Sequence, residues 1–304
     1  MRRPANTLRF RECQNAQHFG AKARANGTEK IAAKCVAFCG RNGVTRMMTV
    51  CYPVASMTEL PDLMSQQVDE LLFGETCEIL EESGAFARVR TDYGYEGYVE
   101  RRALMEPLHA PNRMVSVPFC DLLCENRNFF RPMMTLPMGS RLDVGYSDTE
   151  KRYGFAVLPS KRIWYVHKEH LRPLPTGLGT EEELREGIVT AALSYLGTQY
   201  RWGGRSPSGV DCSGLCFMAY RLNGLTIWRD ADITKNEHLR QVPLSEAKPG
   251  DLLFFPGHMA LSLGGDAFLH ASASAGKVIR DDFTKGPYGP ALKEQLLCAA
   301  TYFA

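Results

Sequence analysis

The 304-residue sequence lacks the long apolar run that a membrane-spanning helix needs, which is about 20 consecutive residues. It also lacks an excess of charge of either sign, because 36 basic side chains nearly balance 34 acidic ones and the formal net charge is +2. No block of basic residues occurs that could follow a phosphate backbone. We therefore expect no nucleic-acid partner and no membrane span.

Cysteine patterns typical of metal sites are missing as well, although the chain contains ten cysteines. Cys35 and Cys39, like Cys120 and Cys124, have three residues between them instead of the two of a CxxC pair, and no histidines accompany them. About eight of the ten stand in apolar stretches, as buried free thiols do. We expect no metal and no cofactor, and the absence of a visible secretory signal peptide predicts a reducing, cytoplasmic location.

Residues 1–46 lack hydrophobic periodicity. Four arginines lie near the start, but the apolar core of a signal peptide does not follow them. Met47 and Met48 directly precede the first strand-like run, which begins at Thr49. We expect translation to start at Met47 or Met48, and residues 1–46 to be a disordered or wrongly assigned extension.

The most informative motif is Asp211-Cys212-Ser213-Gly214, which stands at the start of a predicted helix. The apolar face of this helix consists of Leu215, Met218, Ala219 and Leu222. A thiol in the first turn is exposed to the positive end of the helix dipole, which favours the thiolate. Cys212 is therefore the candidate nucleophile, and Asp211 is a candidate cap for the helix.

Two histidines downstream belong to a predicted hairpin. Strand-like runs at 259–263 and 267–271 flank the turn signal Gly264-Gly265-Asp266. If Gly264 is the centre of the hairpin, His258 and His270 lie directly opposite each other, with Cβ atoms roughly 5 Å apart. His258 could then accept the thiol proton while His270 orients its ring, an arrangement typical of a cysteine peptidase.

Residues 180–304 resemble an NlpC/P60 domain, a papain-like fold that cuts peptidoglycan stem peptides. The resemblance rests on five motifs in order, namely Tyr200-Arg201-Trp202-Gly203-Gly204, Asp211-Cys212-Ser213-Gly214, Pro249-Gly250-Asp251-Leu252, Gly257-His258 and Leu269-His270-Ala271. It implies an α+β fold with Cys212 as nucleophile, His258 as base and His270 as third residue. It also implies that the Tyr200 hydroxyl and the Cys212 amide lie near the oxyanion.

Short strand-like runs precede this domain and are typical of small all-β barrels. Residues 49–107 resemble a bacterial SH3 (SH3b) domain, and residues 110–173 resemble a second, more diverged copy. A linker at 174–179 separates them from the catalytic domain. Thr180 and Glu183 form a capping box for its first predicted helix.

The order SH3b, SH3b, NlpC/P60 is similar to that of the γ-D-glutamyl-L-diamino acid endopeptidases of muropeptide recycling. This resemblance implies peptidoglycan-derived substrates, L-Ala-γ-D-Glu-diamino acid peptides with a free amine. It implies that Glu59, Tyr95 and Asp211 meet the substrate ammonium and that Ser213 helps to bind the glutamate. An N-acylated alanine would leave such buried polar groups unpaired.

Several alternatives stay open at this stage. Tyr93 or Tyr98 could face the cleft in place of Tyr95, Glu59 could be merely solvated, and Asp211 could serve only as a cap. A secreted hydrolase of intact cell wall and a non-catalytic wall-binding protein are the rival functions. The sequence leaves open whether diaminopimelate or lysine is the third substrate residue.

Overall fold

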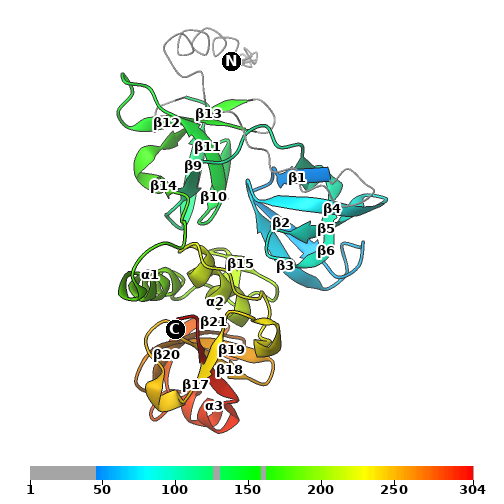
Figure 1. The fold of residues 1–304 in the computed structure, drawn as a ribbon. Helices are drawn as coiled ribbons and strands as arrows, with labels where there is room; N and C mark the ends of the chain where they lie inside the picture. Colours follow the sequence, from blue (N-terminus) through cyan, green and yellow to red (C-terminus); the bar gives the residue numbers. More distant parts are fainter. Residues whose placement is uncertain (1–45, 126–130, 159–161, 304) are drawn as a thin grey trace, which may run out of the picture.

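The computed structural model describes residues 46–125, 131–158 and 162–303 (Figure 1). The extension expected over residues 1–46 lies outside this part of the chain except for Arg46. That residue already begins strand β1, so the expected boundary is one residue too late. Met48 follows it with a buried side chain and belongs to the core of the first barrel.

The first barrel is a seven-stranded antiparallel sheet with the order β3-β2-β6-β5-β4-β1-β7. Its strands are β1 (Arg46–Val50), β2 (Val54–Thr58), β3 (Gln67–Leu72), β4 (Thr76–Ser83), β5 (Phe86–Thr91), β6 (Glu96–Glu100) and β7 (Leu104–Met105). Alternation along β5, where buried and exposed residues take turns, shows one face packed on the barrel core.

The second barrel has the order β10-β9-β13-β12-β11-β8-β14. Its strands are β8 (Arg113–Val115), β9 (Phe119–Leu123), β10 (Met134–Pro137), β11 (Arg141–Gly145), β12 (Tyr153–Val157), β13 (Ile163–His167) and β14 (Leu171–Pro173). Each strand occupies the place of the strand seven numbers earlier, so the two barrels share one topology. Phe73 of the first barrel packs into the core of the second, which joins the two.

The catalytic domain contains a six-stranded sheet with the order β17-β22-β18-β19-β20-β21, and a short β15-β16 pair. Its elements are α1 (Glu181–Leu193), β15 (Arg205–Ser206), β16 (Gly209–Val210), α2 (Cys212–Arg221), β17 (Arg240–Val242), β18 (Leu252–Phe255), β19 (His258–Gly264), β20 (Ala267–Ser272), β21 (Lys277–Asp282), α3 (Gly289–Gln295) and β22 (Cys298–Thr301). The capping box of Thr180 and Glu183 is present at the start of α1. No helix in the described ranges is long and apolar enough to cross a membrane.

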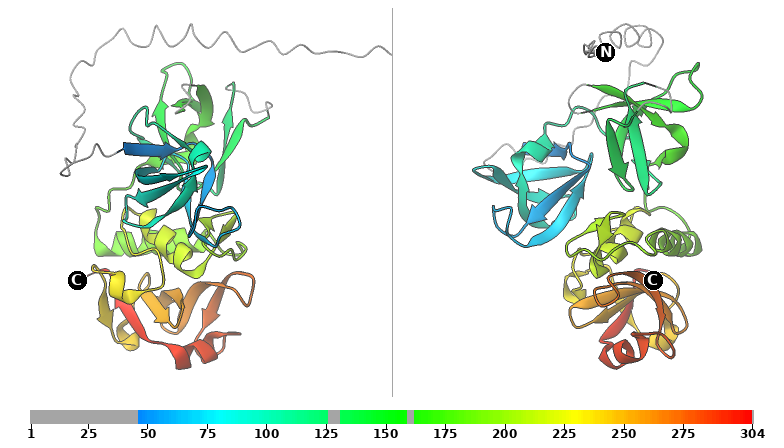
Figure 2. Two further views of the ribbon diagram at one scale, coloured as in Figure 1. Left: turned by 90° about the vertical axis from the view of Figure 1, so that its right-hand side faces the viewer. Right: turned by 180° about the vertical axis from the view of Figure 1, so that it is seen from behind.

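Helices α1 and α2 form a layer between the two barrels and the six-stranded sheet (Figure 1), and the further views agree (Figure 2). Helix α2 packs on β19 and β20, and α1 packs beside it. The hydrophobic core around α2 continues into the barrels through Leu72 and Met138. The start of α2 therefore lies in a region bounded by both the sheet and the first barrel.

Candidate active site

Cys212 is the first residue of α2 and is 8% exposed. Asp211 caps the helix, because its Oδ1 accepts a hydrogen bond of 2.5 Å from the Gly214 amide. Gly214 has no room for a side chain, since a Cβ would lie 2.2 Å from the Gly204 carbonyl oxygen. Every α2 residue up to Tyr220 is buried. The thiol is thus fixed at the end of a helix embedded in the core.

The thiol of Cys212 is protonated in the free protein at neutral pH. Burial raises its pKa to about 11, and the Asp211 carboxylate acts in the same direction. Hydrogen bonds with backbone groups of Met259 and Ser213 lower the pKa without outweighing burial. The helix start thus favours the thiolate through the backbone of Ser213, as expected, but burial outweighs this effect, and Cys212 needs a base.

His258 begins β19 and is the base candidate. Its Nε2 lies 2.9 Å from Nδ1 of His270 in β20, and the two rings meet at 72°. Since Nε2 faces His270, Nδ1 is the nitrogen left to accept the proton of Cys212. The backbone of Met259, the next residue of β19, hydrogen-bonds with the thiol, so this strand starts beside the nucleophile.

The hairpin register differs from the expected one. Leu261 pairs with Leu269, and the register shifts between Ser262 and Gly264. Such a β-bulge adds a residue to one strand. Continued along the strands, this register makes the two histidines diagonal neighbours instead of directly opposed partners. They still share one face of the sheet, because the residue directly opposite His270 is two positions from His258, and side chains two positions apart lie on the same face.

A buried carboxylate extends the histidine pair. Burial lowers the pKa of His258 to about 4, with His270 adding to the effect, and burial also lowers the pKa of His270 to about 4. Both rings are therefore neutral at pH 7. If Nε2 of His258 donates to Nδ1 of His270, the hydrogen of His270 lies on its own Nε2. That nitrogen faces Oδ2 of Asp281 at 3.6 Å.

Tyr200 lies beside the nucleophile and is bridged to Val210. Burial raises its pKa to about 12, and the proximity of Cys212 and Asp211 contributes. The phenol is therefore protonated at neutral pH and can donate a hydrogen bond. The Cys212 amide heads α2, where no preceding helical turn accepts its N–H. These two donors suit an oxyanion, as the resemblance implied.

Tyr95 of the first barrel reaches the catalytic domain. Its hydroxyl donates a hydrogen bond of 3.1 Å to Oδ1 of Asp230, and its ring packs on Trp228 with centroids 5.5 Å apart. Burial raises the pKa of Asp230, and the carboxylates of Asp69 and Asp211 contribute. The tyrosine chosen from the sequence therefore lies at the domain border beside a carboxylate.

Asp211 and Ser213 are engaged by other groups. Both carboxylate oxygens of Asp211 accept hydrogen bonds, from Gly203, Ser213, Gly214 and Arg229. The Ser213 hydroxyl also accepts one from Arg229. Glu59 is exposed, and its side chain has no hydrogen bond or ion pair with the described residues. Substrate contacts of these three residues stay predictions.

Three charged residues of this site were not predicted from the sequence: Asp69, Arg229 and Asp230. Arg229 donates to Asp69 at 2.6 Å and to Asp211 at 3.1 Å, and the side chains of Asp69, Arg229 and Asp211 are buried. One signal was available, because the two carboxylates Asp69 and Glu70 stand in β3 between Val68 and Leu71. A charged residue in a strand is either exposed or paired, and the sequence alone does not distinguish these cases.

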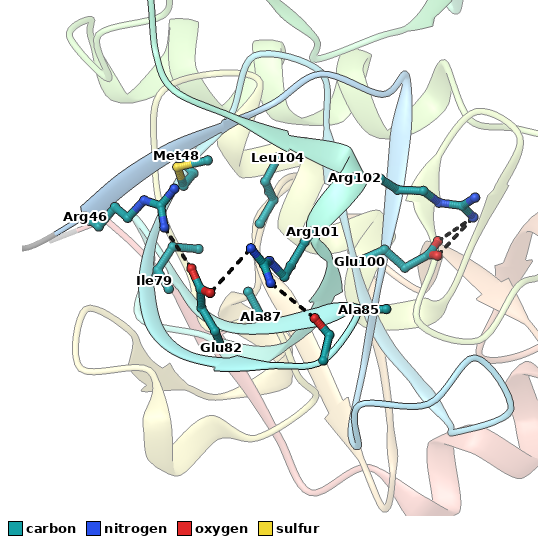
Figure 3. A pocket seen from close by; sticks show the side chains of 11 residues that line it. Arg46, Met48, Ile79, Glu82, Ala85, Ala87, Glu100, Arg101, Arg102 and Leu104 are labelled. Atoms are coloured by element: carbon teal, nitrogen blue, oxygen red, sulfur yellow. Dashed lines mark hydrogen bonds and ion pairs between the residues drawn. The ribbon is translucent and has the colours of Figure 1, made fainter.

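A cavity of about 600 Å³ lies elsewhere, in the first barrel (Figure 3). Met48 and Ile79 form part of its apolar wall. Glu82 lies between Arg46 and Arg101 and pairs with both. None of the catalytic candidates lines this cavity, so it is separate from the site around Cys212.

Comparison with family models gives two matches. Residues 197–297 match the NlpC/P60 family, and residues 60–105 match the bacterial SH3 domain. The first match spans the helix start, both histidines and Tyr200. The second covers only the first barrel, so the identity of the second barrel rests on its shared topology.

Individual relatives extend across the domains. The chain is 38% identical to dipeptidyl-peptidase 6 of Lysinibacillus sphaericus over 236 residues, which cover 74% of this chain and 87% of that protein. It is 29% identical to γ-D-glutamyl-L-lysine dipeptidyl-peptidase of Bacillus subtilis, covering 69% of this chain and 73% of that protein. A crystal structure of an NlpC/P60 family protein from Bacillus cereus has the same fold, with a TM-score of 0.71, 18% identity and coverage of 85% and 100% of the two chains. The chain therefore belongs to the NlpC/P60 family.

Proposed function

We propose that the protein is a cysteine peptidase that cleaves the γ-D-glutamyl–diamino acid bond of peptidoglycan-derived peptides with a free N-terminal L-alanine. The names of the two relatives that match most of the chain support this substrate class. The observation that carries the proposal is the hydrogen bond between Tyr95 and Asp230. It joins a phenol of the barrel to a carboxylate of the catalytic domain, close to the residue before Cys212.

The chemistry follows from the neutral pair of Cys212 and His258. His258 accepts the thiol proton as the sulfur attacks the carbonyl carbon of the γ-D-glutamyl group. The Cys212 amide and the Tyr200 hydroxyl stabilise the resulting oxyanion. The protonated His258 then gives its proton to the leaving amine, and water hydrolyses the remaining thioester. His270 keeps Nε2 of His258 engaged throughout.

Charge around the cleft favours a bound ammonium. Three carboxylates, those of Asp69, Asp211 and Asp230, lie around the guanidinium of Arg229, and Asp69 also pairs with Arg205 at 3.5 Å. The carboxylate oxygens of Asp211 are already occupied, whereas the Asp230 carboxylate accepts a hydrogen bond only from Tyr95 within the described ranges. Asp230 is therefore the carboxylate with most capacity for a new donor. An N-acylated alanine offers no positive charge to this site.

A free alanine amine occurs in released peptides, not in intact wall, where it is amide-linked. We therefore propose a role in muropeptide recycling and a cytoplasmic location, in line with the sequence expectation. Hydrolysis of intact stem peptides is the competing function, and the same assay separates the two.

The test compares kcat/KM on L-Ala-γ-D-Glu-meso-diaminopimelate, its lysine analogue and the N-acetylated form of each. We expect a preference for the free amine of about 10³-fold, because unpaired buried polar groups cost several kcal/mol. Tyr95→Phe keeps the ring and removes one partner, and should reduce this preference. Equal rates on free and acetylated peptides would exclude recycling and support the wall hydrolase.

A further inference from the structure

We propose that Arg229, anchored by Asp69 of the first barrel, is a positioning residue for Cys212, so that the barrel takes part in catalysis as well as in substrate selection. The inference rests on the proposed cysteine peptidase chemistry. It does not depend on which peptide is cut.

The guanidinium of Arg229 is buried and uses all five of its N–H donors. Nε donates to Oδ1 of Asp69 at 2.6 Å. The other bonds are from Nη1 to Ser213 Oγ (2.9 Å) and Asp211 Oδ1 (3.1 Å), and from Nη2 to Asp211 Oδ2 (3.2 Å) and the Gly204 carbonyl (3.3 Å). A planar group with every donor engaged has one orientation.

These bonds hold both chain neighbours of the nucleophile. Asp211 precedes Cys212 and caps α2, and Ser213 follows Cys212. Arg229 bonds to both, so its displacement would move the first turn of the helix. Asp69 fixes Arg229 from the barrel side, and is itself fully buried and held by the Tyr93 hydroxyl. A continuous set of polar contacts therefore runs from β3 of the barrel to the start of α2.

Arg229 also compensates the charge beside the thiol. The titratable and charged groups around Cys212 are Asp211, Arg229, Tyr200, Cys216 and His258. After burial, Asp211 is the main cause that raises the pKa of Cys212, whereas Arg229 lowers it. Without the guanidinium, Asp211 would act uncompensated and less thiolate would form. This effect is distinct from a general loosening of the interface.

Arg221 offers a matched control and lies on α2, the helix that begins with Cys212. It is the last residue of α2, largely buried, and pairs with Asp92 at 2.6 Å and Glu75 at 3.3 Å. Both partners belong to the first barrel, as Asp69 does. Loss of Arg221 therefore removes interdomain ion pairs without touching the helix start. A purely structural role of Arg229 predicts the same result for both arginines.

The experiment measures alkylation of Cys212 by iodoacetamide against pH, by mass spectrometry, together with kcat and KM. Arg229→Gln should slow alkylation at pH 8 at least about tenfold and lower kcat at least about 100-fold, with a smaller change in KM. Arg229→Lys keeps the charge and should restore the alkylation rate to within about threefold of the wild type, but should not restore kcat.

Two further variants separate the anchor from the interface. Asp69→Asn should lower kcat about tenfold without slowing alkylation. Arg221→Gln should change both rates less than about threefold.

Wild-type alkylation and turnover in folded Arg229→Gln would overturn the proposal, and so would equal losses in Arg221→Gln. If Arg229→Gln does not fold, the double variant Asp69→Asn/Arg229→Gln replaces it with the same expectations, because it removes one charge of each sign. Alkylation needs no substrate. An error in the proposed peptide specificity would therefore leave this result unaffected.

Discussion

Asp69 and Arg229 lie 2.6 Å apart, Oδ1 to Nε, although 160 positions separate them in the sequence. This pair is one of several between carboxylates of the first barrel and arginines of the catalytic domain. The acidic partners are Asp69, Glu70, Glu75 and Asp92, and the basic partners are Arg201, Arg205, Arg221 and Arg229. The domain border is therefore an ionic interface, buried except at Arg201 and Asp92, and its members differ in how much they stabilise the protein.

Arg205→Met should destabilise the protein by about 3–5 kcal/mol, since it removes one of the two arginine partners of each of the buried carboxylates Asp69 and Glu75. The Arg205 side chain is fully buried beside Glu75. Burial alone would raise the pKa of Glu75, but the charges of Arg205 and Arg221 hold this pKa at about 2. Arg201→Met is the control, because its side chain is 39% exposed and its single pair with Glu70 should contribute no more than about 1 kcal/mol. Urea unfolding measures both. Equal losses would contradict the burial argument.

Cys212→Ala should abolish cleavage, with kcat reduced about 10⁴-fold or more, because no other group can form the thioester. His258→Ala should come close to this loss, since the thiol of the free protein is protonated and needs the base. The assay is product formation from the free-amine peptide, with circular dichroism to verify the fold. Appreciable turnover by pure Cys212→Ala would refute covalent catalysis.

Stability should fall as the pH drops from about 6.5 to 4. The folded pKa of His270 is about 4, below its ordinary 6.5, so the unfolded chain takes up the proton first. The contribution of neutral, buried His270 to the free energy of unfolding is complete above pH 6.5 and is lost as the pH falls through 4. This contribution amounts to roughly 2–3 kcal/mol. Urea unfolding at pH 7 and pH 4 measures it. His270→Asn should reduce the pH dependence, and His109→Asn, at an exposed position, should not.

Asp230→Asn should weaken cleavage of the free-amine peptide much more than Glu59→Gln does. Asp230 is partly buried beside Tyr95, whereas Glu59 is exposed and solvated. We expect a loss in kcat/KM on the order of 10²–10³-fold for Asp230→Asn and under about threefold for Glu59→Gln. Measuring kcat/KM of both variants on the free-amine peptide decides which of the two carboxylates contacts the ammonium. A larger effect of Glu59→Gln would assign the ammonium contact to Glu59, as the family resemblance implied.

The placement of the candidate nucleophile could be predicted because its signals are local in the sequence. Cys212 stands at the start of an amphipathic helix with a capping residue before it, and both signals lie within a few positions. The two histidines could be assigned to one face because side chains alternate between the faces of a strand, so that the face depends only on whether the offset between paired positions is even or odd. Their register could not be predicted, since the bulge at Ser262–Gly264 depends on how the strands twist and pack.

The charge arrangement around Cys212 could not be predicted. It depends on Asp69 from one domain meeting Arg229 from another, and no periodicity relates positions so far apart. The protonated thiol has the same origin, because burial by neighbouring elements outweighs the local effect of the helix start. Local signals indicated the candidate groups Cys212, His258 and His270, whereas tertiary contacts set their protonation.

The acidic face of the first barrel limits how this chain could be recombined with others. A barrel grafted from another protein would have to bring carboxylates at the positions of Asp69, Glu70 and Glu75. Without them, Arg205 would be buried without an acidic partner, at a cost of several kcal/mol, and Arg229 would keep only its pair with Asp211. In a functional chimera, the first barrel and the catalytic domain therefore have to come from the same parent protein.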